Sequence, residues 1–196
     1  MKQPIIPFLK QSFSTDTPVS KIITIDTGIA SIVLHLMQKA EIINFSNEWV
    51  IIFEYSGALD KIMGDGLMAV FGYPVSTGKD AEEAVNTAIG MQKKRVVFNE
   101  ERKTRNLEPI RIGVGIHTGE VIMGSVGSES RMDFTAIGDT VNTASILEGL
   151  TKELGPPIII SDETRKNLNN NFITEKLDTI KVRGRSESEG IYRVVI

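Results

Sequence analysis

The sequence of 196 residues contains no cysteine, which excludes disulfide bonds and thiolate metal sites. It also contains no uninterrupted apolar run of about 18 residues, the length that indicates a membrane-spanning helix. Positive charge is not in excess, because the formal net charge is −3. This balance argues against nucleic acid and against an anionic membrane surface as partners.

A recognisable secretory signal is lacking as well. The N-terminal segment contains Pro4 and Pro7 and no long apolar stretch. Since disulfides are also absent, we expect a cytoplasmic location, or the cytoplasmic part of a larger protein. Pro18 is a further break in regular structure. We therefore expect residues 1–20 to be an irregular lead-in and residues 21–196 to form a single domain.

What is present is typical of a globular protein, with 41% hydrophobic and 24% charged residues. Strand and helix patterns alternate irregularly, which predicts an α+β sandwich: a sheet with antiparallel pairs, covered by helices. The expected strands are 21–26, 58–63, 67–71, 110–116, 120–126, one within 128–137, 157–160, 172–182 and 191–195. The expected helices are 29–55, 79–105, about 138–154, and a short one capped by Ser161.

The clearest hairpin signal is the segment 57–72, which reads GALDKIMGDGLMAVFG. Asp-Gly between two apolar runs indicates a tight turn, because glycine accepts a positive φ without steric cost. The turn would hold Asp65 at its tip. Lys61 lies four residues earlier, so both side chains can project from one face of a strand. A carboxylate beside an ammonium suits a metal-bound polyphosphate, while the simpler alternative is a solvated surface ion pair.

The segment Lys79–Arg105 is the clearest helix, because its apolar residues recur at helical spacing on one face. Asp80 is a suitable N-cap for this helix. Glu83 stands where the reciprocal bond of a capping box is made. The sequence therefore predicts a helix with a well-defined start.

A second hairpin is predicted where two apolar strands, 110–116 and 120–126, flank His117-Thr118-Gly119. His117 itself is expected to be a packing residue. A lone histidine does not have the spacing of a metal-binding motif.

From about Ile52 to its end, the chain resembles the catalytic domain of the class III nucleotidyl cyclases, the adenylate and guanylate cyclase family. The resemblance rests on GALDKIMGDGLMAVFG, on RIGVGIHTGEVIMGSVGSESRMDFTAIGDTVNTAS and on KVRGRSE, in that order. It implies a ferredoxin-like sandwich with a mostly antiparallel sheet, and homodimers that share their active sites. It also implies attack of the ribose 3′-oxygen on the α-phosphorus of a nucleoside triphosphate, assisted by two Mg²⁺ or Mn²⁺ ions.

Residue roles follow from this resemblance position by position. Asp65 matches a metal-binding aspartate, and Lys61 and Thr135 match the two positions that select the purine. Lysine and threonine there are similar to the pattern of ATP enzymes. The chemistry agrees, because Lys61 can donate to a purine ring nitrogen and the Thr135 hydroxyl can accept from the adenine amino group.

Further positions complete the expected site. Asn142 matches the asparagine that orients the ribose, and Arg183 stands where the family usually has a lysine near the terminal phosphates. Asp26, after the first strand, is the candidate for the second metal-binding aspartate. Its distance from Asp65 in the sequence is shorter than is usual in the family. The alternative role for Asp26 is to cap a following helix.

One departure from the family bears directly on activity. Four residues after Asn142, the family places an arginine that stabilises phosphate charge in the transition state, and this chain has Ile146. The leading hypothesis is therefore an adenylate cyclase of reduced activity that makes cyclic AMP from ATP. The alternative is a catalytically silent cyclase homology domain that binds nucleotide or dimerises as a regulator.

Overall fold

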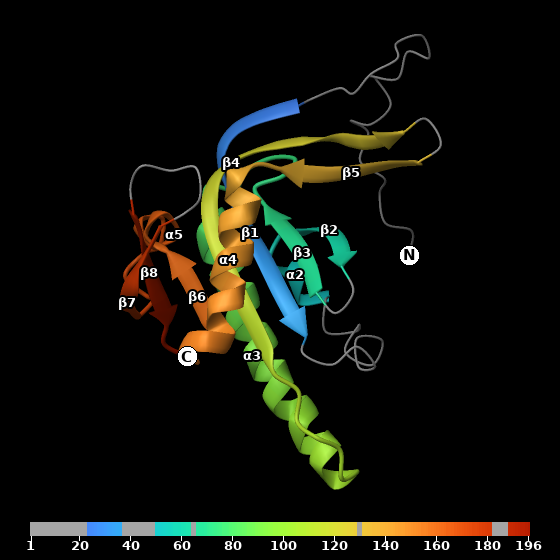
Figure 1. The fold of residues 1–196 in the computed structure, drawn as a ribbon, viewed down its shortest axis with the longest axis vertical. Helices are drawn as coiled ribbons and strands as arrows, with labels where there is room; N and C mark the ends of the chain where they lie inside the picture. The colour runs from blue at the N-terminus through green and yellow to red at the C-terminus, as the bar shows by residue number, and fades with distance from the viewer. Residues whose placement is uncertain (1–22, 37–49, 64–65, 129–130, 182–187) are drawn as a thin grey trace.

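Eight strands of the described residues form one sheet in a computed structural model (Figure 1), which describes residues 23–36, 50–63, 66–128, 131–181 and 188–196. The expected lead-in, 1–20, lies outside the described residues. The strands are β1 (Ile23–Leu36), β2 (Ala58–Met63), β3 (Gly66–Phe71), β4 (Ile112–Ser128), β5 (Arg131–Ile137), β6 (Ile158–Ser161), β7 (Thr174–Lys181) and β8 (Ser188–Val194). The helices are α2 (Val50–Glu54), α3 (Asp80–Thr104), α4 (Asp139–Leu154) and α5 (Asp162–Lys166).

The strand order is β2-β3-β1-β4-β6-β8-β7, and β5 pairs with β4. Among the pairings of the described strands, β4 with β6 is parallel and the others are antiparallel. The predicted α+β architecture with a mostly antiparallel sheet is confirmed. In Figure 1 the β4–β5 pair extends beyond the rest of the sheet as an arm.

Helices cover both faces of the sheet, and β3 shows why. Leu67, Ala69 and Phe71 pack in one core cluster with α2 and α3, whereas Met68 and Val70 pack in another with Ala144 of α4. All of β3 is buried. A continuous apolar run is what a strand covered on both faces requires.

The prediction of a helix over 29–55 is wrong for residues 29–36 and right for α2. Residues 29–36 continue β1, and the helical part is confined to α2. The register pairs Ile32 with Ala69 of β3 and with Ile116 of β4. The segment IASIVLHL is rich in apolar and β-branched residues, so pairing on both edges outweighs its weak helical pattern.

The predicted turn at His117-Thr118-Gly119 is also wrong, because β4 runs through these residues without a break. β1 pairs with β4 on both sides of Gly119. Gly119 serves close packing: a Cβ atom there would lie 2.6 Å from the Thr140 Oγ1 of α4. The hairpin in this region is instead β4–β5, where Ser128 pairs with Arg131.

The two predicted helix caps have different outcomes. Asp80 is the first residue of α3, and its carboxylate accepts from the Thr77 N–H at 3.0 Å instead of capping the helix. It therefore fastens the preceding loop. Ser161 does cap α5, accepting from the Thr164 N–H at 3.1 Å, as predicted.

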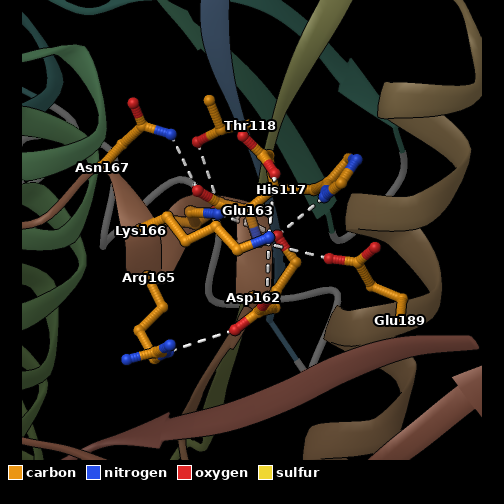
Figure 2. A network of polar contacts seen from close by, with 10 residues as sticks. His117, Thr118, Asp162, Glu163, Arg165, Lys166, Asn167 and Glu189 are labelled. Carbon is orange, nitrogen blue, oxygen red and sulfur yellow. Dashed lines mark hydrogen bonds and ion pairs between the residues drawn. The ribbon is translucent and has the colours of Figure 1, made fainter.

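The packing role of His117 is confirmed. Its side chain is buried, and Nδ1 lies 2.7 Å from the Ser161 Oγ, which joins β4 to the start of α5. Figure 2 shows this contact beside the ion pairs of α5. Asp162 there pairs with Arg165 at 3.2 Å and with Lys166 at 3.0 Å.

Candidate purine-recognition site

The β2–β3 hairpin forms as predicted, with one irregularity at Asp60. Leu59 pairs with Ala69 and Lys61 pairs with Met68, so Asp60 is an extra residue on β2. Such a β-bulge disturbs the strict alternation of side chains and can re-aim one of them. Asp60 and Lys61 are neighbours in the chain, and the bulge explains how their charged ends meet.

The Asp60 carboxylate connects β2 to β5. Its Oδ2 accepts from the Thr135 Oγ1 at 2.7 Å, and its Oδ1 accepts from the Ala136 N–H at 3.1 Å. The Lys61 Nζ lies 3.6 Å from the same Oδ2. The two residues predicted to select the purine, Lys61 and Thr135, are thus brought together by a carboxylate that the sequence analysis missed.

The burial of this cluster decides what it can do. The Asp60 side chain is 2% exposed, whereas that of Lys61 is 37% exposed. The carboxylate is therefore shielded from water, and the ammonium beside it can still reach a ligand. A sequence signal did exist, because a charged residue inside the apolar run Ala58–Met63 needs a buried partner.

Asn142 and Ile146 lie on α4, one helical turn apart. Both are exposed, with Ile146 at 41%. Residues four apart lie on the same side of a helix, so an arginine at 146 would point to the same region as Asn142. The start of α4 is tied to β4 by the Thr140 Oγ1, which donates to the Glu120 carbonyl at 2.7 Å.

Asp65 and Arg183 lie outside the described residues. Asp26 lies in β1 at a register shift between Ile25 and Ile29. Gly66, which follows Asp65, pairs with His35 at the other end of β1. The separation along the strand from Asp26 to His35 is roughly 30 Å at about 3.3 Å per residue.

The described backbone thus does not bring Asp26 to the β2–β3 turn, and this register disagrees with its assignment as the second metal ligand. Within the described ranges, no three His, Asp or Glu side chains are grouped to hold a metal ion. Nor does any helix in the part of the chain that the structure describes have the length and apolarity to cross a membrane.

Comparisons with known proteins bear on the whole domain. The family model described as the adenylate and guanylate cyclase catalytic domain matches residues 54–194. The chain is 39% identical over 170 residues to an adenylate cyclase of Anabaena cylindrica, covering 81% of this chain and 33% of that protein. It is 34% identical over 145 residues to adenylate cyclase 1 of Rhizobium meliloti, covering 74% and 22%. The chain thus spans a third or less of the length of these curated relatives.

Solved structures agree with the fold. The adenylyl cyclase CyaB from P. aeruginosa has a TM-score of 0.77 at 27% identity, covering 91% of this chain and 97% of that one. The guanylyl cyclase Cya2 has a TM-score of 0.75 at 27% identity, covering 85% and 91%. A dimeric guanylyl cyclase domain from Blastocladiella emersonii shares the fold with a TM-score of 0.66. On the family match and these likenesses, the chain belongs to the adenylate and guanylate cyclase catalytic domain family, the class III nucleotidyl cyclases.

Proposed function

We propose that this domain is an adenylate cyclase that converts ATP to 3′,5′-cyclic AMP and pyrophosphate. The observation that carries the proposal is the meeting of Lys61 and Thr135 at the Asp60 carboxylate. An ammonium donor and a hydroxyl acceptor complement the ring nitrogen and the amino group of adenine. Relatives named adenylate cyclases support the same substrate.

The reaction is an intramolecular displacement at phosphorus. The ribose 3′-oxygen bonds to the α-phosphorus, the bond to pyrophosphate breaks, and the hydroxyl proton passes to solvent. We assign Asn142 to orienting the ribose and Arg183 to binding the terminal phosphates.

Cyclases of this family are generally metal-dependent. We propose two Mg²⁺ or Mn²⁺ ions, which would neutralise the triphosphate and prefer hard oxygen ligands such as Asp65. The register of β1 argues against Asp26 as the second carboxylate of this site.

We propose that the domain acts as a homodimer with shared active sites. The exposed large apolar side chains of the β4–β5 arm support this partner: Ile122, Val126, Met132, Phe134 and Ile137. The register of β4 with β5 puts Ile122, Val126 and Ile137 on one face of this arm and Met132 and Phe134 on the other. Exposed apolar side chains of this kind are typical of a protein interface. Because the cyclase family acts as dimers with shared active sites, the partner that we propose for this surface is a second copy of this chain.

A second candidate function is a nucleotide-binding module without turnover. The exposed Ile146 on α4 favours it, because isoleucine offers no donor to a phosphate. The test is to incubate the purified protein with ATP or GTP and Mn²⁺, and to measure cyclic AMP, cyclic GMP and nucleotide binding separately.

We expect cyclic AMP to form slowly and in excess over cyclic GMP. Binding of ATP with no product would favour the regulatory module. Failure to bind either nucleotide would contradict both candidates. Replacing Thr135 with valine keeps the shape of the side chain but removes its hydroxyl, and should reduce the preference for ATP.

A further inference from the structure

The hydroxyl of Thr135 has one proton, and the structure shows where it goes. Oγ1 lies 2.7 Å from the Asp60 Oδ2 and 3.4 Å from the Ala136 carbonyl oxygen. The carboxylate is the closer acceptor and forms the stronger, charge-assisted bond. The proton of Thr135 is therefore directed to Asp60, which leaves the lone pairs of this oxygen, in a residue that is 6% exposed, as its accepting sites.

We infer that Asp60 is a positioning residue that sets the base selectivity of the site, by making Thr135 an acceptor. This inference rests on the proposed function. A hydroxyl that can only accept suits the adenine amino group. The same hydroxyl offers no donor to the O6 of guanine, which is itself an acceptor.

Asp60 acts on Lys61 through the same oxygen. The Nζ of Lys61 lies 3.6 Å from the Oδ2 that Thr135 contacts. One buried carboxylate thus holds a donor and an acceptor side by side. The bulge in β2 makes this possible, because Asp60 is the extra residue of the pairing with β3.

A purely structural role for Asp60 is the competing explanation. Its Oδ1 accepts from the Ala136 N–H at 3.1 Å and so also fastens β5 to β2. Loss of that link alone would weaken the binding of both nucleotides equally. Only the role in selectivity changes the ratio of the two affinities.

The experiment uses 3′-deoxy-ATP and 3′-deoxy-GTP, which have no attacking hydroxyl, so that binding is measured without turnover. In the Asp60→Asn variant the amide oxygen can still accept from the Ala136 N–H. The amide NH₂ then faces the Thr135 oxygen, and the hydroxyl proton is released toward the ligand. We expect the ratio of the two affinities, measured by calorimetry, to fall by roughly tenfold, the value of one hydrogen bond.

Two further variants separate the explanations. Asp60→Asn made in a Thr135→Val background should leave the ratio unchanged, because no hydroxyl remains to be directed. Asp178→Asn, the same change on the exposed surface of β7, should match the wild type. A tenfold change in the Thr135→Val background, or an unchanged ratio in the Asp60→Asn single variant, would overturn the inference.

If Asp60→Asn does not fold, the wild-type protein decides the question. It should bind purine riboside triphosphate, which lacks the amino group, more weakly than ATP, and equal affinity would overturn the inference. If no cyclic AMP forms but the ratios of the affinities for 3′-deoxy-ATP and 3′-deoxy-GTP change as expected, only the proposed activity is refuted. If cyclic AMP forms but the Asp60→Asn variant has the same ratio of the two affinities as the wild type, only the role of Asp60 is refuted.

Discussion

At the scale of single residues, the site depends on the contacts that one buried carboxylate, Asp60, makes with the side chains around it. Asp60, almost fully buried, lies within bonding distance of Thr135 and close to the partly exposed ammonium of Lys61. A buried carboxylate with several donors is stable only while those donors stay in place. Changes at the edge of the cluster should therefore alter recognition, and changes at its centre should alter both recognition and folding.

Lys61→Glu tests recognition at this edge. A glutamate beside Asp60 removes the donor to the adenine ring nitrogen and offers an acceptor that suits the N1–H of guanine. We expect the preference for ATP over GTP to fall roughly tenfold in binding measured by calorimetry. Lys176→Glu, on exposed β7, is the matched control. An unchanged ratio would remove Lys61 from base recognition.

Ile146→Arg tests whether activity is limited by the absence of the arginine that the family has at this position. In-line attack at the α-phosphorus builds negative charge on the phosphate oxygens, and a guanidinium supplies planar, permanently charged donors. A preorganised donor of this kind is worth about 10²–10³ in rate, so we expect kcat to rise while ATP affinity changes little.

Leu154→Arg is the control for Ile146→Arg, because Leu154, at the far end of α4, is 45% exposed and Ile146 is 41% exposed. Sedimentation of the Ile146→Arg variant tests the other reading, in which Ile146 packs in the dimer interface. A variant that stays dimeric, binds ATP and gains no rate would show that another step limits the reaction.

At the scale of elements, the position of α4 against β4 is set by a glycine. A Cβ atom at Gly115 would lie 2.2 Å from the Glu148 nitrogen and 2.3 Å from the Ala144 carbonyl oxygen, both backbone atoms of α4. Backbone cannot move aside as a flexible side chain can. The close approach of α4, which carries Asn142, thus requires glycine at this point.

Gly115→Ala should therefore lower the free energy of unfolding, by about 1–3 kcal/mol or more, because α4 must shift. Gly149→Ala is the control, since a Cβ atom there would meet nothing within 4 Å. In the middle of α4 it should raise the free energy of unfolding by about 0.5–1 kcal/mol. Urea denaturation measures both, and equal effects of the two changes would contradict the packing argument.

The pH dependence of stability should involve the start of α5. Hydrogen bonding to Lys166 is the main cause that lowers the pKa of Asp162 below 3.8; partial burial opposes it, and Arg165 also contributes. A carboxyl whose pKa is lower in the folded state adds stability above its ordinary pKa. That stability is lost as the pH falls through the lower, folded value.

The difference in urea midpoint between the wild type and Asp162→Asn should accordingly shrink as the pH falls from 7 toward 3. The effect should be small and decrease with added salt, because the Lys166 side chain is 57% exposed. Asp178→Asn serves as the control. A midpoint difference independent of pH would show that this ion pair does not stabilise the fold.

At the scale of the whole molecule, the β4–β5 arm is the main candidate surface for a second copy. Figure 1 shows it extending beyond the layered body of the domain. Val126 is 47% exposed and Ile122 is 42% exposed, and the register puts both on one face of the arm. Phe134 is less suitable for a test, because its ring centroid lies 5.8 Å from that of Tyr73 and it also packs within the chain.

We predict that Val126→Glu combined with Ile122→Glu shifts the protein to a monomer in sedimentation velocity, because two charges would enter the same apolar face of the arm. Cyclase activity should fall with the dimer. Val97→Glu on α3, where the side chain is 62% exposed, is the control. A wild-type protein that remains monomeric at high concentration with nucleotide bound would contradict the shared site.

Local sequence patterns were enough to predict the elements whose signals come from neighbouring residues. The β2–β3 hairpin follows from Asp-Gly between apolar runs, α3 and α4 follow from their periodicity, and Ser161 caps α5. Lys61 and Thr135 were expected from the resemblance to the cyclase family, and the structure brings both to Asp60. Their role in selecting the purine stays a prediction. These features depend on neighbours within a few residues or on a motif in order.

The course of the strands and the contacts of Asp60 depend on pairings that exist only in the folded sheet. β1 continues through residues 29–36 because β3 and β4 pair with its two edges, and β4 passes Gly119 without turning. The register of β1 places Asp26 far from the β2–β3 turn, although both lie within a short stretch of sequence. Asp60 meets Thr135 across 75 residues of chain. Such pairings depend on the packed sheet, and no local pattern encodes them.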